Sequence, residues 1–402
     1  MASAQRVLIL SEHPYPDHAT VRRNVAHLIA SGVTVDLVCL HGRHRASANA
    51  QDAPALHLHQ LRMTHKRSGA IRYLQEYLGF WLWSFAVTFG LSLRYSYVAV
   101  LADNPPDFLI FVSLIARLRG ARVVLEMFEL VPELTMARMK MPREHGVVRA
   151  LHAAEWLSVR YADAVIAVSR QCRDALVARG VDGRKVWVVP NTIPAPPPNE
   201  ASPEDGTDPF IVTHCSLVER YGVQVAIRAM GVLRDRRPGL TLHVLGDGEY
   251  RDQLVALTED LGLQHRVLFR GFLPWAEAIS EIRRAQVGIV AVIADGYGEL
   301  LLPTKLLEYA DNQVPVACAR LPTIADNFPA DCLAYFEPGD SRGLAEAIER
   351  LLSDAPGALA QARRAKAVVN GLSWDSLAPR FMDALGIAGR PLRTELPIPV
   401  ED

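Results

Sequence analysis

The amino-acid sequence predicts an α/β protein of two tandem domains, each built on a doubly wound parallel sheet. Its 402 residues exceed one ordinary compact domain, and 50% of them are hydrophobic, so each half can bury its own core. Short β-branched runs alternate with amphipathic helical stretches along almost the whole chain, an order typical of parallel sheets with crossover helices. One proline-rich stretch interrupts this alternation and divides the chain in two.

The first domain is expected over residues 1–191. Residues 6–10 (RVLIL) predict a buried strand, and a helix follows with apolar residues at helical spacing (Val21, Val25, Leu28 and Ile29) and Gly32 placed to end it. Further strands are expected at residues 33–40, 97–101, 122–125, 163–168 and 185–189. The pattern predicts a Rossmann-like sheet.

Residues 192–209 (TIPAPPPNEASPEDGTDP) hold six prolines and no apolar periodicity, which indicates a linker. A second Rossmann-like domain is expected over residues 210–371, with strands at 210–213, 240–245, 266–269, 287–292 and 314–317 and helices starting at Gly222 and Pro303. Two such sheets imply a central cleft where the carboxyl ends of their strands face each other.

Composition excludes several classes of protein. The 43 basic and 44 acidic residues nearly balance, which argues against a nucleic-acid binder. The five cysteines have no paired or metal-ligand spacing, so they indicate buried thiols in a reducing compartment. The apolar run at residues 7–10 is too short for a signal peptide, so a cytoplasmic protein is expected.

Residues 78–93 (LGFWLWSFAVTFGLSL) form the most membrane-like stretch. As a helix it would extend about 24 Å, short of a hydrocarbon core of about 30 Å, and we interpret it as a buried or membrane-surface helix. The neighbouring Lys66, Arg67 and Arg72 suit anionic headgroups, which predicts peripheral contact with the inner face of the membrane. A buried helix beside a solvated basic loop is the alternative.

The strongest local motif is the segment at residues 296–316, GYGELLLPTKLLEYADNQVPV. Pro303 suits the first position of a helix, and the free amides that follow, at Thr304 and Lys305, would face an anion together with the helix dipole. Lys305 and Glu308 stand three residues apart on one helix face, where a cation suits a diphosphate and a carboxylate suits a ribose diol. A surface ion pair contributing about 0.3–0.5 kcal/mol is the alternative.

This segment resembles the donor-site signature of family 4 glycosyltransferases, which are retaining enzymes of the GT-B fold. The Pro-Thr-Lys-x-x-Glu-Tyr form of that signature is intact. By resemblance Glu308 holds the ribose hydroxyls, and Pro303, Thr304 and Leu307 belong to the same donor site. The signature's first glutamate falls on Leu300, with Glu299 one place away, and Gln313 stands where glycine is usual.

Three further segments resemble the family's nucleotide domain in order and spacing. Residues 211–222 resemble its first strand and loop, and Arg220 is the candidate to neutralise the departing diphosphate, since Tyr221 holds the usual lysine position. Residues 245–249 (LGDGE) and 267–271 (VLFRG) place Gly246, Arg270 and Gly271 at the donor. A solvated arginine and ordinary turns are the alternatives.

The first half resembles a subset of the same family, through residues 65–80, 104–111, 126–134 and 156–169, so the likeness covers most of residues 5–385. Residues 372–388 are expected to form the last helix, which crosses back to the first domain in GT-B enzymes. One departure is that the family's active-site histidine aligns with Phe128, which can neither donate nor accept a proton. Glu129 or Glu133 is expected to position the acceptor instead, or His13 or His214 to reach in; a helix cap and a core histidine are the respective alternatives.

The resemblance implies transfer of a sugar from a nucleotide diphosphate sugar, with UDP or GDP favoured, to a sugar, lipid-linked or small-molecule acceptor with retention of configuration. Arg220 and Lys305 would stabilise the leaving diphosphate. No Asp-x-Asp occurs, so no essential metal is expected and no other cofactor. An epimerase or hydrolase and a non-catalytic nucleotide-sugar-binding subunit remain alternatives. A Rossmann oxidoreductase would need Gly-x-Gly-x-x-Gly, which residues 11–19 lack.

Overall fold

The computed structural model describes residues 5–42, 54–63, 70–194 and 209–387. Contacts within the chain divide it into unit 1, Met1–Pro190 with Leu377–Asp402, and unit 2, Asn191–Ser376. Most of the predicted linker, residues 195–208, lies outside the described residues, as do Lys66 and Arg67.

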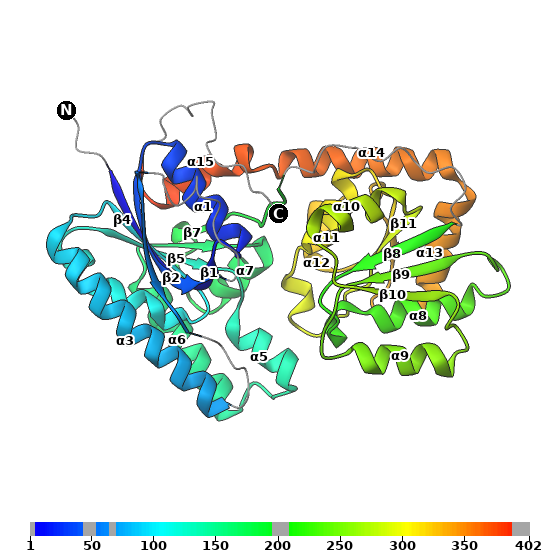
Figure 1. Cartoon of the computed structure of the whole chain (residues 1–402), viewed down its shortest axis with the longest axis horizontal. Coiled ribbons are helices and arrows are strands. Elements are labelled where there is room, and N and C mark those ends of the chain that lie inside the picture. Colours follow the sequence, from blue (N-terminus) through cyan, green and yellow to red (C-terminus); the bar gives the residue numbers. More distant parts are fainter. Residues whose placement is uncertain (1–4, 43–53, 64–69, 195–208, 388–402) are drawn as a thin grey trace. The chain divides into compact units, whose positions relative to one another are not determined.

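Unit 1 is built on a seven-stranded sheet in the order β3-β2-β1-β4-β5-β6-β7, and all its paired strands run parallel (Figure 1). The strands are β1 Arg6–Tyr15, β2 Thr34–His41, β3 Leu56–Leu61, β4 Ala99–Asp103, β5 Arg122–Met127, β6 Ala164–Ala167 and β7 Val186–Val188. The sequence pattern does not predict β3, because this edge strand (LHLHQL) carries histidines and a glutamine between its leucines.

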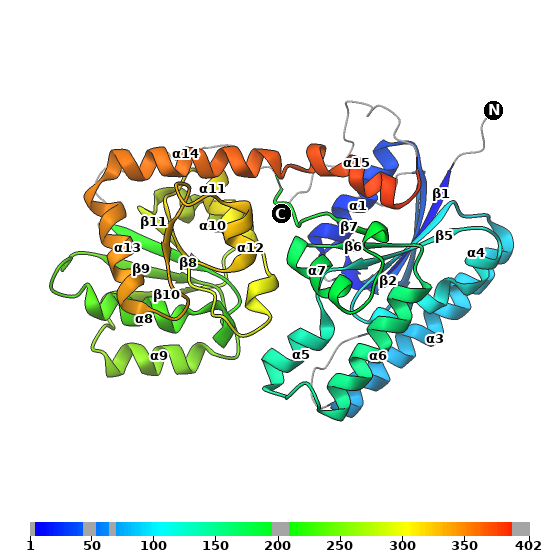
Figure 2. The same cartoon turned by 180° about the vertical axis from the view of Figure 1, so that it is seen from behind.

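The helices of unit 1 cover both faces of this sheet. They are α1 Ala19–Ala30, α3 Ala70–Arg94, α4 Leu114–Leu118, α5 Val131–Met139, α6 Gly146–Tyr161, α7 Arg170–Ala178 and α15 Trp374–Ala384, with 3-10 turns η1 Asp107–Ser113 and η2 Gly183–Lys185. The crossovers through α3, α4, α6 and α7 all advance in one direction along the sheet, so right-handed connections place them on one face, and α1 lies on the other (Figures 1 and 2). Helix α15 belongs to unit 1 from Leu377 onward, and Arg122 Nε donates to the carbonyl of Ala384 at 2.9 Å.

Unit 2 is built on a six-stranded parallel sheet in the order β10-β9-β8-β11-β12-β13. Its strands are β8 Phe210–His214, β9 Thr241–Leu245, β10 Val267–Gly271, β11 Val287–Val290, β12 Val316–Ala319 and β13 Ala334–Phe336. Its helices are α8 Val223–Val232, α9 Arg251–Asp260, α10 Trp275–Arg284, α11 Thr304–Asp311, α12 Pro322–Asn327, α13 Ser341–Ser353 and α14 Ala355–Gly371, with 3-10 turns η3 Glu219–Tyr221 and η4 Gly298–Leu300.

Both units confirm the predicted fold class of two Rossmann-like parallel α/β domains. In unit 2 the chain starts at β8, winds outward through β9 and β10, and then returns to β11 on the other side of β8. The direction of winding therefore reverses between β8 and β11, and ligands of such sheets bind outside the carboxyl ends of the strands at this point. Among the described residues, no helix is both long enough and apolar enough to cross a membrane.

Candidate functional site

The loops that follow β8 and β11 touch backbone to backbone at the switch point of unit 2. Gly222, with φ of 70°, closes the β8 loop, and a Cβ atom there would lie 1.7 Å from the carbonyl oxygen of Ala291. The amide of Ile293 donates to the carbonyl of Arg220 at 3.0 Å. Only glycine allows this approach and this φ, so residue 222 fixes where the two loops meet.

The loop after β9 joins the same place. Gly246, with φ of 123°, leaves room that a Cβ atom would lack, since that atom would lie 1.9 Å from the carbonyl oxygen of Cys215. The amide of Gly246 donates to the carbonyl of Gly271 at 2.7 Å, which brings the end of β10 alongside. The structure thus gathers the predicted Gly246 and Gly271 near the β8 loop, and neighbouring Arg270 is exposed.

Glu308 on α11 is held by side chains from two other elements. One carboxylate oxygen lies 2.6 Å from Nε2 of His214, at the end of β8, and the other accepts from Nε1 of Trp275 at 3.3 Å. The His214 ring is fixed in turn by the hydroxyl of Tyr309, 3.0 Å from Nδ1. Each carboxylate oxygen can accept a second hydrogen bond, so Glu308 is oriented and keeps acceptor capacity for a diol.

Lys305 is a buried cation, with 4% of its surface exposed. Its ammonium has no anionic partner among the described residues, and its polar neighbour there is the thiol of Cys215. Its Nζ lies 5.2 Å from the centroid of the Tyr221 ring, and its charge acts on the thiol of Cys215, whose pKa is nevertheless raised because burial outweighs that effect. A buried charge without an anionic partner is costly, and an anionic ligand would remove that cost.

Arg220, by contrast, already has a carboxylate partner within the protein. Its Nε donates to Asp295 at 2.9 Å, and its guanidinium lies 4.6 Å from the centroid of the Tyr297 ring. The other oxygen of Asp295 accepts from the amide of Gly298 at 2.7 Å. Arg220 therefore ties the β8 loop to the β11 loop, and the lysine is the less neutralised of the two predicted cations.

The remaining predicted donor residues lie around the start of α11. Pro303 is the residue before the helix rather than its first residue, and Thr304 is exposed at the first helical position. Glu299 accepts from the amide of Gly296 at 2.9 Å, so its carboxylate closes its own loop. The Leu307 side chain, in contrast, is 1% exposed in the hydrophobic core, where it supports α11 from below.

In unit 1, Phe128 packs against two histidines at tilted angles. Its ring centroid lies 5.0 Å from that of His18 and 5.4 Å from that of His13, and the two imidazoles stack at 4.0 Å. Burial, and then the proximity of His13, lower the pKa of His18 to about 3, so this ring is neutral at physiological pH. His13 Nε2 lies 3.3 Å from the carbonyl of Asn104, so its ring is held at the carboxyl end of the sheet.

The three glutamates at the end of β5 and just after it occupy different environments. Glu126 is 2% exposed and accepts from the amide side chain of Asn24 at 2.7 Å, and its burial beside the likewise buried Asp103 raises the pKa of both carboxyls. Glu129 is half-buried, and the Asn104 side chain fixes its backbone. Sequence reasoning missed Asp103, although its position at the end of a buried strand is a signal.

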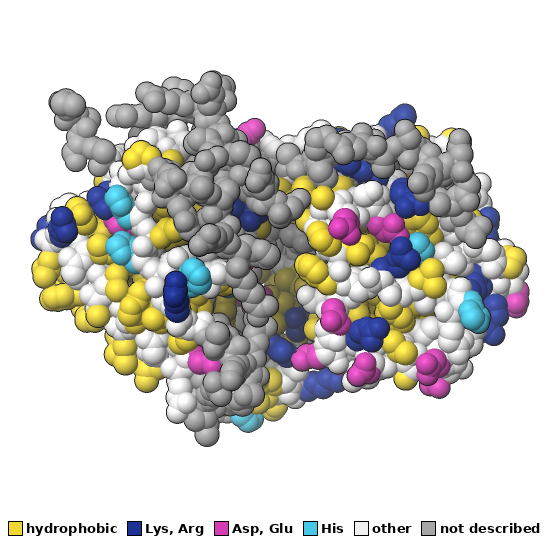
Figure 3. Space-filling view, in the orientation of Figure 1, with side chains coloured by type: hydrophobic (Ala, Val, Ile, Leu, Met, Phe, Trp, Pro, Cys, Tyr) yellow, Lys and Arg dark blue, Asp and Glu magenta, His cyan; other side chains and the backbone are white. Residues whose placement is uncertain are grey.

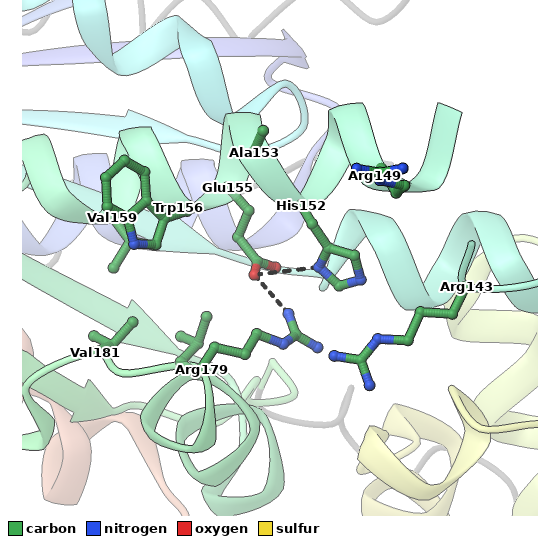
Figure 4. Close-up of a pocket in the computed structure, with 10 residues that line it drawn as sticks. Arg143, Arg149, His152, Ala153, Glu155, Trp156, Val159, Arg179 and Val181 are labelled. Atoms are coloured by element: carbon green, nitrogen blue, oxygen red, sulfur yellow. Dashed lines mark hydrogen bonds and ion pairs between the residues drawn. The ribbon is translucent and has the colours of Figure 1, made fainter. Parts of the chain in front are cut away.

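Glu133 is bound by Arg179, which also donates to Glu155 at 2.5 Å. Arg179 and Glu155 line a cavity of about 400 Å³ formed between α6 and α7, into which His152 and Arg143 also point (Figure 4). Burial raises the pKa of Glu155 to about 7 despite the nearby guanidinium. Glu133 therefore serves an ion-pair network through Arg179.

Glu12, at the carboxyl end of β1, gives a pH prediction. Burial, with a smaller effect of Glu76, raises the pKa of its carboxyl from 4.5 to about 9. The folded protein retains this proton while the unfolded chain releases it, so stability falls as pH rises from about 4.5 to about 9. Glu12→Gln removes this dependence.

Relative to wild type, Glu12→Gln is expected to raise the free energy of unfolding by about 4 kcal/mol more at pH 8 than at pH 5. Denaturant unfolding at both pH values measures the difference. Parallel pH profiles for the two proteins would contradict this assignment.

Comparison with known proteins gives two family matches. The "Glycosyl transferase 4-like domain" family matches residues 18–192, and the "Glycosyl transferases group 1" family matches residues 198–368. Together these ranges take in most of the chain.

Individual relatives agree with the family matches. A glycogen synthase of Mycobacterium tuberculosis is 27% identical over 57% of this chain and 55% of its own. A GDP-mannose-dependent phosphatidylinositol monomannoside mannosyltransferase of Mycolicibacterium smegmatis is 32% identical over 29% of this chain and 31% of its own. The chain thus spans about half the length, or less, of these curated relatives. The Anabaena protein HepE, in complex with UDP-glucose, superposes with a TM-score of 0.72 at 18% identity, over 95% of this chain and 99% of its own.

Proposed function

We propose that this chain, which belongs to the glycosyltransferases of the GT-B fold, transfers a sugar from a nucleotide diphosphate sugar to an acceptor. Unit 2 supplies the donor site at the switch point of its sheet, as expected for open parallel sheets. The single observation that carries the proposal is Lys305, a buried ammonium without an anionic partner among the described residues, at the start of α11. A diphosphate supplies the negative charge that this position favours.

The other residues of the site have separate roles. Glu308, oriented by His214 and Trp275, accepts the ribose hydroxyls of the donor. Arg220 holds the two loops together through Asp295 and adds positive charge near the leaving group. As the glycosidic bond breaks, negative charge develops on the diphosphate, and Lys305 with the first amides of α11 stabilises it. The oxygen of the incoming hydroxyl then bonds to the anomeric carbon on the face the diphosphate leaves, and its proton passes to the departing diphosphate, so the configuration is retained.

No protein nucleophile and no metal take part in this proposal. UDP and GDP are the favoured nucleotides, because the relatives include a UDP-glucose complex and a GDP-mannose-dependent enzyme. The acceptor is a sugar, a lipid-linked sugar or a small molecule, bound by unit 1. A lipid-linked acceptor would bring a cytoplasmic enzyme to the inner face of the membrane.

A non-catalytic nucleotide-sugar-binding subunit is the second candidate, because Phe128 cannot transfer a proton. The two functions are separated by a thermal-shift panel of UDP, GDP, ADP and dTDP, followed by an assay of donor turnover with and without acceptors. One nucleotide is expected to stabilise the protein by about 2.7 kcal/mol at a hundred times its dissociation constant. Turnover that depends on an acceptor supports a transferase, whereas acceptor-independent turnover indicates a hydrolase. Binding without turnover supports the subunit, and no binding overturns the proposal.

Two glutamate variants in unit 1 test the proposed acceptor site. Glu129→Gln is expected to lower transfer about tenfold or more, because a half-buried carboxylate near the strand ends can orient an acceptor hydroxyl. Glu133→Gln is the matched comparison, and we expect it to lower thermal stability more than activity, since it leaves Arg179 short of a partner. Steady-state kinetics and melting curves measure both.

Phe128→His tests the changed acceptor side separately. We expect the wild-type protein to transfer sugar without this substitution. An inactive wild type that regains turnover only in Phe128→His would instead identify the chain as a binding subunit. Normal transfer by Glu129→Gln would remove the carboxylate role.

A further inference from the structure

Helix α3 differs from an ordinary surface helix in which of its side chains are buried and which are exposed. Its buried side, at a spacing of four residues, consists of Phe80 followed by the small hydroxyl residues Ser84, Thr88 and Ser92. This side packs against β2, β3, η1 and α4. Several of its large apolar residues are exposed on the other side, so burial in this unit does not account for their presence.

The outward side of α3 has no charged residue from Tyr77 to Leu93. It exposes Leu78, Leu82, Phe89 and Leu93, with Leu82 56% and Phe89 43% exposed. Helix α4 continues this surface with Leu114 and with Leu118, which is 75% exposed. We call these six side chains the apolar face, and Figure 3 shows hydrophobic side chains gathered over α3.

Exposed large hydrophobic side chains are much rarer in unit 2 than in unit 1. Of the fourteen large hydrophobic side chains that are exposed among the described residues, unit 2 contributes only Phe272 and Leu359. A contiguous exposed apolar surface in one unit alone marks an interaction site.

The charges around the apolar face indicate the partner. Arg94 ends α3 and Arg119 follows α4, where its guanidinium donates to the Ser96 hydroxyl, so both lie at the edge of the face. On the same side of the sheet, α6 exposes Arg149 and Arg160, and its sole carboxylate, Glu155, is buried. A partner with anionic groups above an apolar layer matches this arrangement, whereas a second copy of the chain would bring arginines against arginines.

We infer that the apolar face of α3 and α4 docks unit 1 on the surface of an anionic lipid bilayer. The leucine and phenylalanine side chains enter the boundary between headgroups and acyl chains, and the arginines contact lipid phosphates. Helix α3 lies along the surface, because its other side is packed on the sheet. The inference goes beyond the proposed sugar transfer and does not depend on it.

The test is flotation of the full chain with vesicles of equal parts phosphatidylglycerol and phosphatidylethanolamine at low salt, beside vesicles of phosphatidylcholine alone. Wild type is expected to float with the anionic vesicles. Leu82→Glu/Phe89→Glu is expected to lower the partition coefficient about tenfold or more. Leu359→Glu, a comparably exposed leucine of unit 2, is the matched control and is expected to float like wild type.

A second variant, Arg94→Gln/Arg119→Gln, tests the charges without touching the apolar face. It is expected to weaken binding to anionic vesicles and to reduce its salt dependence. Melting curves and the nucleotide-induced shift show whether each variant is folded, and because that shift reports on unit 2, loss of vesicle binding and loss of donor binding are distinguishable. Absence of flotation by wild type, or flotation of the Leu82→Glu/Phe89→Glu variant at the wild-type level, would overturn the inference. So would a wild-type dimer in light scattering that this variant dissociates, because a second copy would then cover the face.

Discussion

Lys305→Ala is expected to lower kcat for sugar transfer about 30- to 1000-fold, equivalent to 2–4 kcal/mol in the barrier. The ammonium acts on charge that develops on the diphosphate in the transition state, so kcat and kcat/KM should fall together. Thermal stability without ligand should stay the same or rise, because the substitution removes a buried charge that has no anionic partner among the described residues. Loss of activity with no loss of stability distinguishes a functional lysine from a structural one.

Lys366→Ala is the matched control for this prediction. Lys366 lies in the same unit, but its ammonium donates to the carbonyl of Asp311 at 2.6 Å and to its carboxylate at 3.2 Å. Its loss should therefore lower the melting temperature and leave kcat within about twofold. Steady-state kinetics and melting curves of the two variants give the comparison. Wild-type kinetics in Lys305→Ala would exclude the lysine from the mechanism.

Glu308→Ala is expected to weaken nucleotide binding about 10- to 100-fold. The substitution removes charged hydrogen bonds to the ribose, each contributing about 1.5–3 kcal/mol, and also releases the side chains of His214 and Trp275 that orient the site. Titration calorimetry with the nucleotide selected by the thermal-shift panel measures the change. Glu346→Gln, an exposed glutamate on α13, is the control and should bind like wild type. An unchanged dissociation constant in Glu308→Ala would remove this residue from the donor site.

The sequence was sufficient to predict the fold because hydrophobic periodicity reports directly on parallel sheets. Each buried strand of both units coincides with an apolar β-branched run, and Gly32, with φ of 80°, follows α1 as its position after the apolar stripe predicts. The strands that the sequence pattern did not predict are short edge strands. β3 and β13 carry polar residues or only three residues, so their pairing is decided by the neighbouring strand rather than by their own pattern.

The candidate site was predictable only in part. The order of motifs identified the segments, but the partners of each side chain come from residues far apart in the chain. Arg220 pairs with Asp295, 75 residues away, and Glu308 with His214, 94 residues away. Sequence spacing within one helix therefore placed Lys305 and Glu308 correctly on α11 but could not show that one cation is neutralised and the other is not. The roles assigned to them stay predictions.

In unit 1 the surroundings of the candidate residues were even harder to predict from the sequence. The substitution that puts Phe128 in place of a histidine is visible in the sequence, yet its packing against His13 and His18 depends on β1 and α1 lying beside β5. The sequence likewise does not show which side of α3 faces outward, because the stretch has no charged residue to mark a solvent-facing side. Only the contacts of Ser84, Thr88 and Ser92 with the interior show which side faces out.

The central claim is that Lys305 recognises the diphosphate of the donor. The most direct measurement compares the affinities of wild type and Lys305→Ala for the selected nucleoside diphosphate and for its nucleoside alone. Wild type should prefer the diphosphate strongly, and the substitution should remove about tenfold or more of that preference while leaving nucleoside affinity unchanged. An equal preference in both proteins would contradict the account, because the diphosphate would then be bound without this lysine.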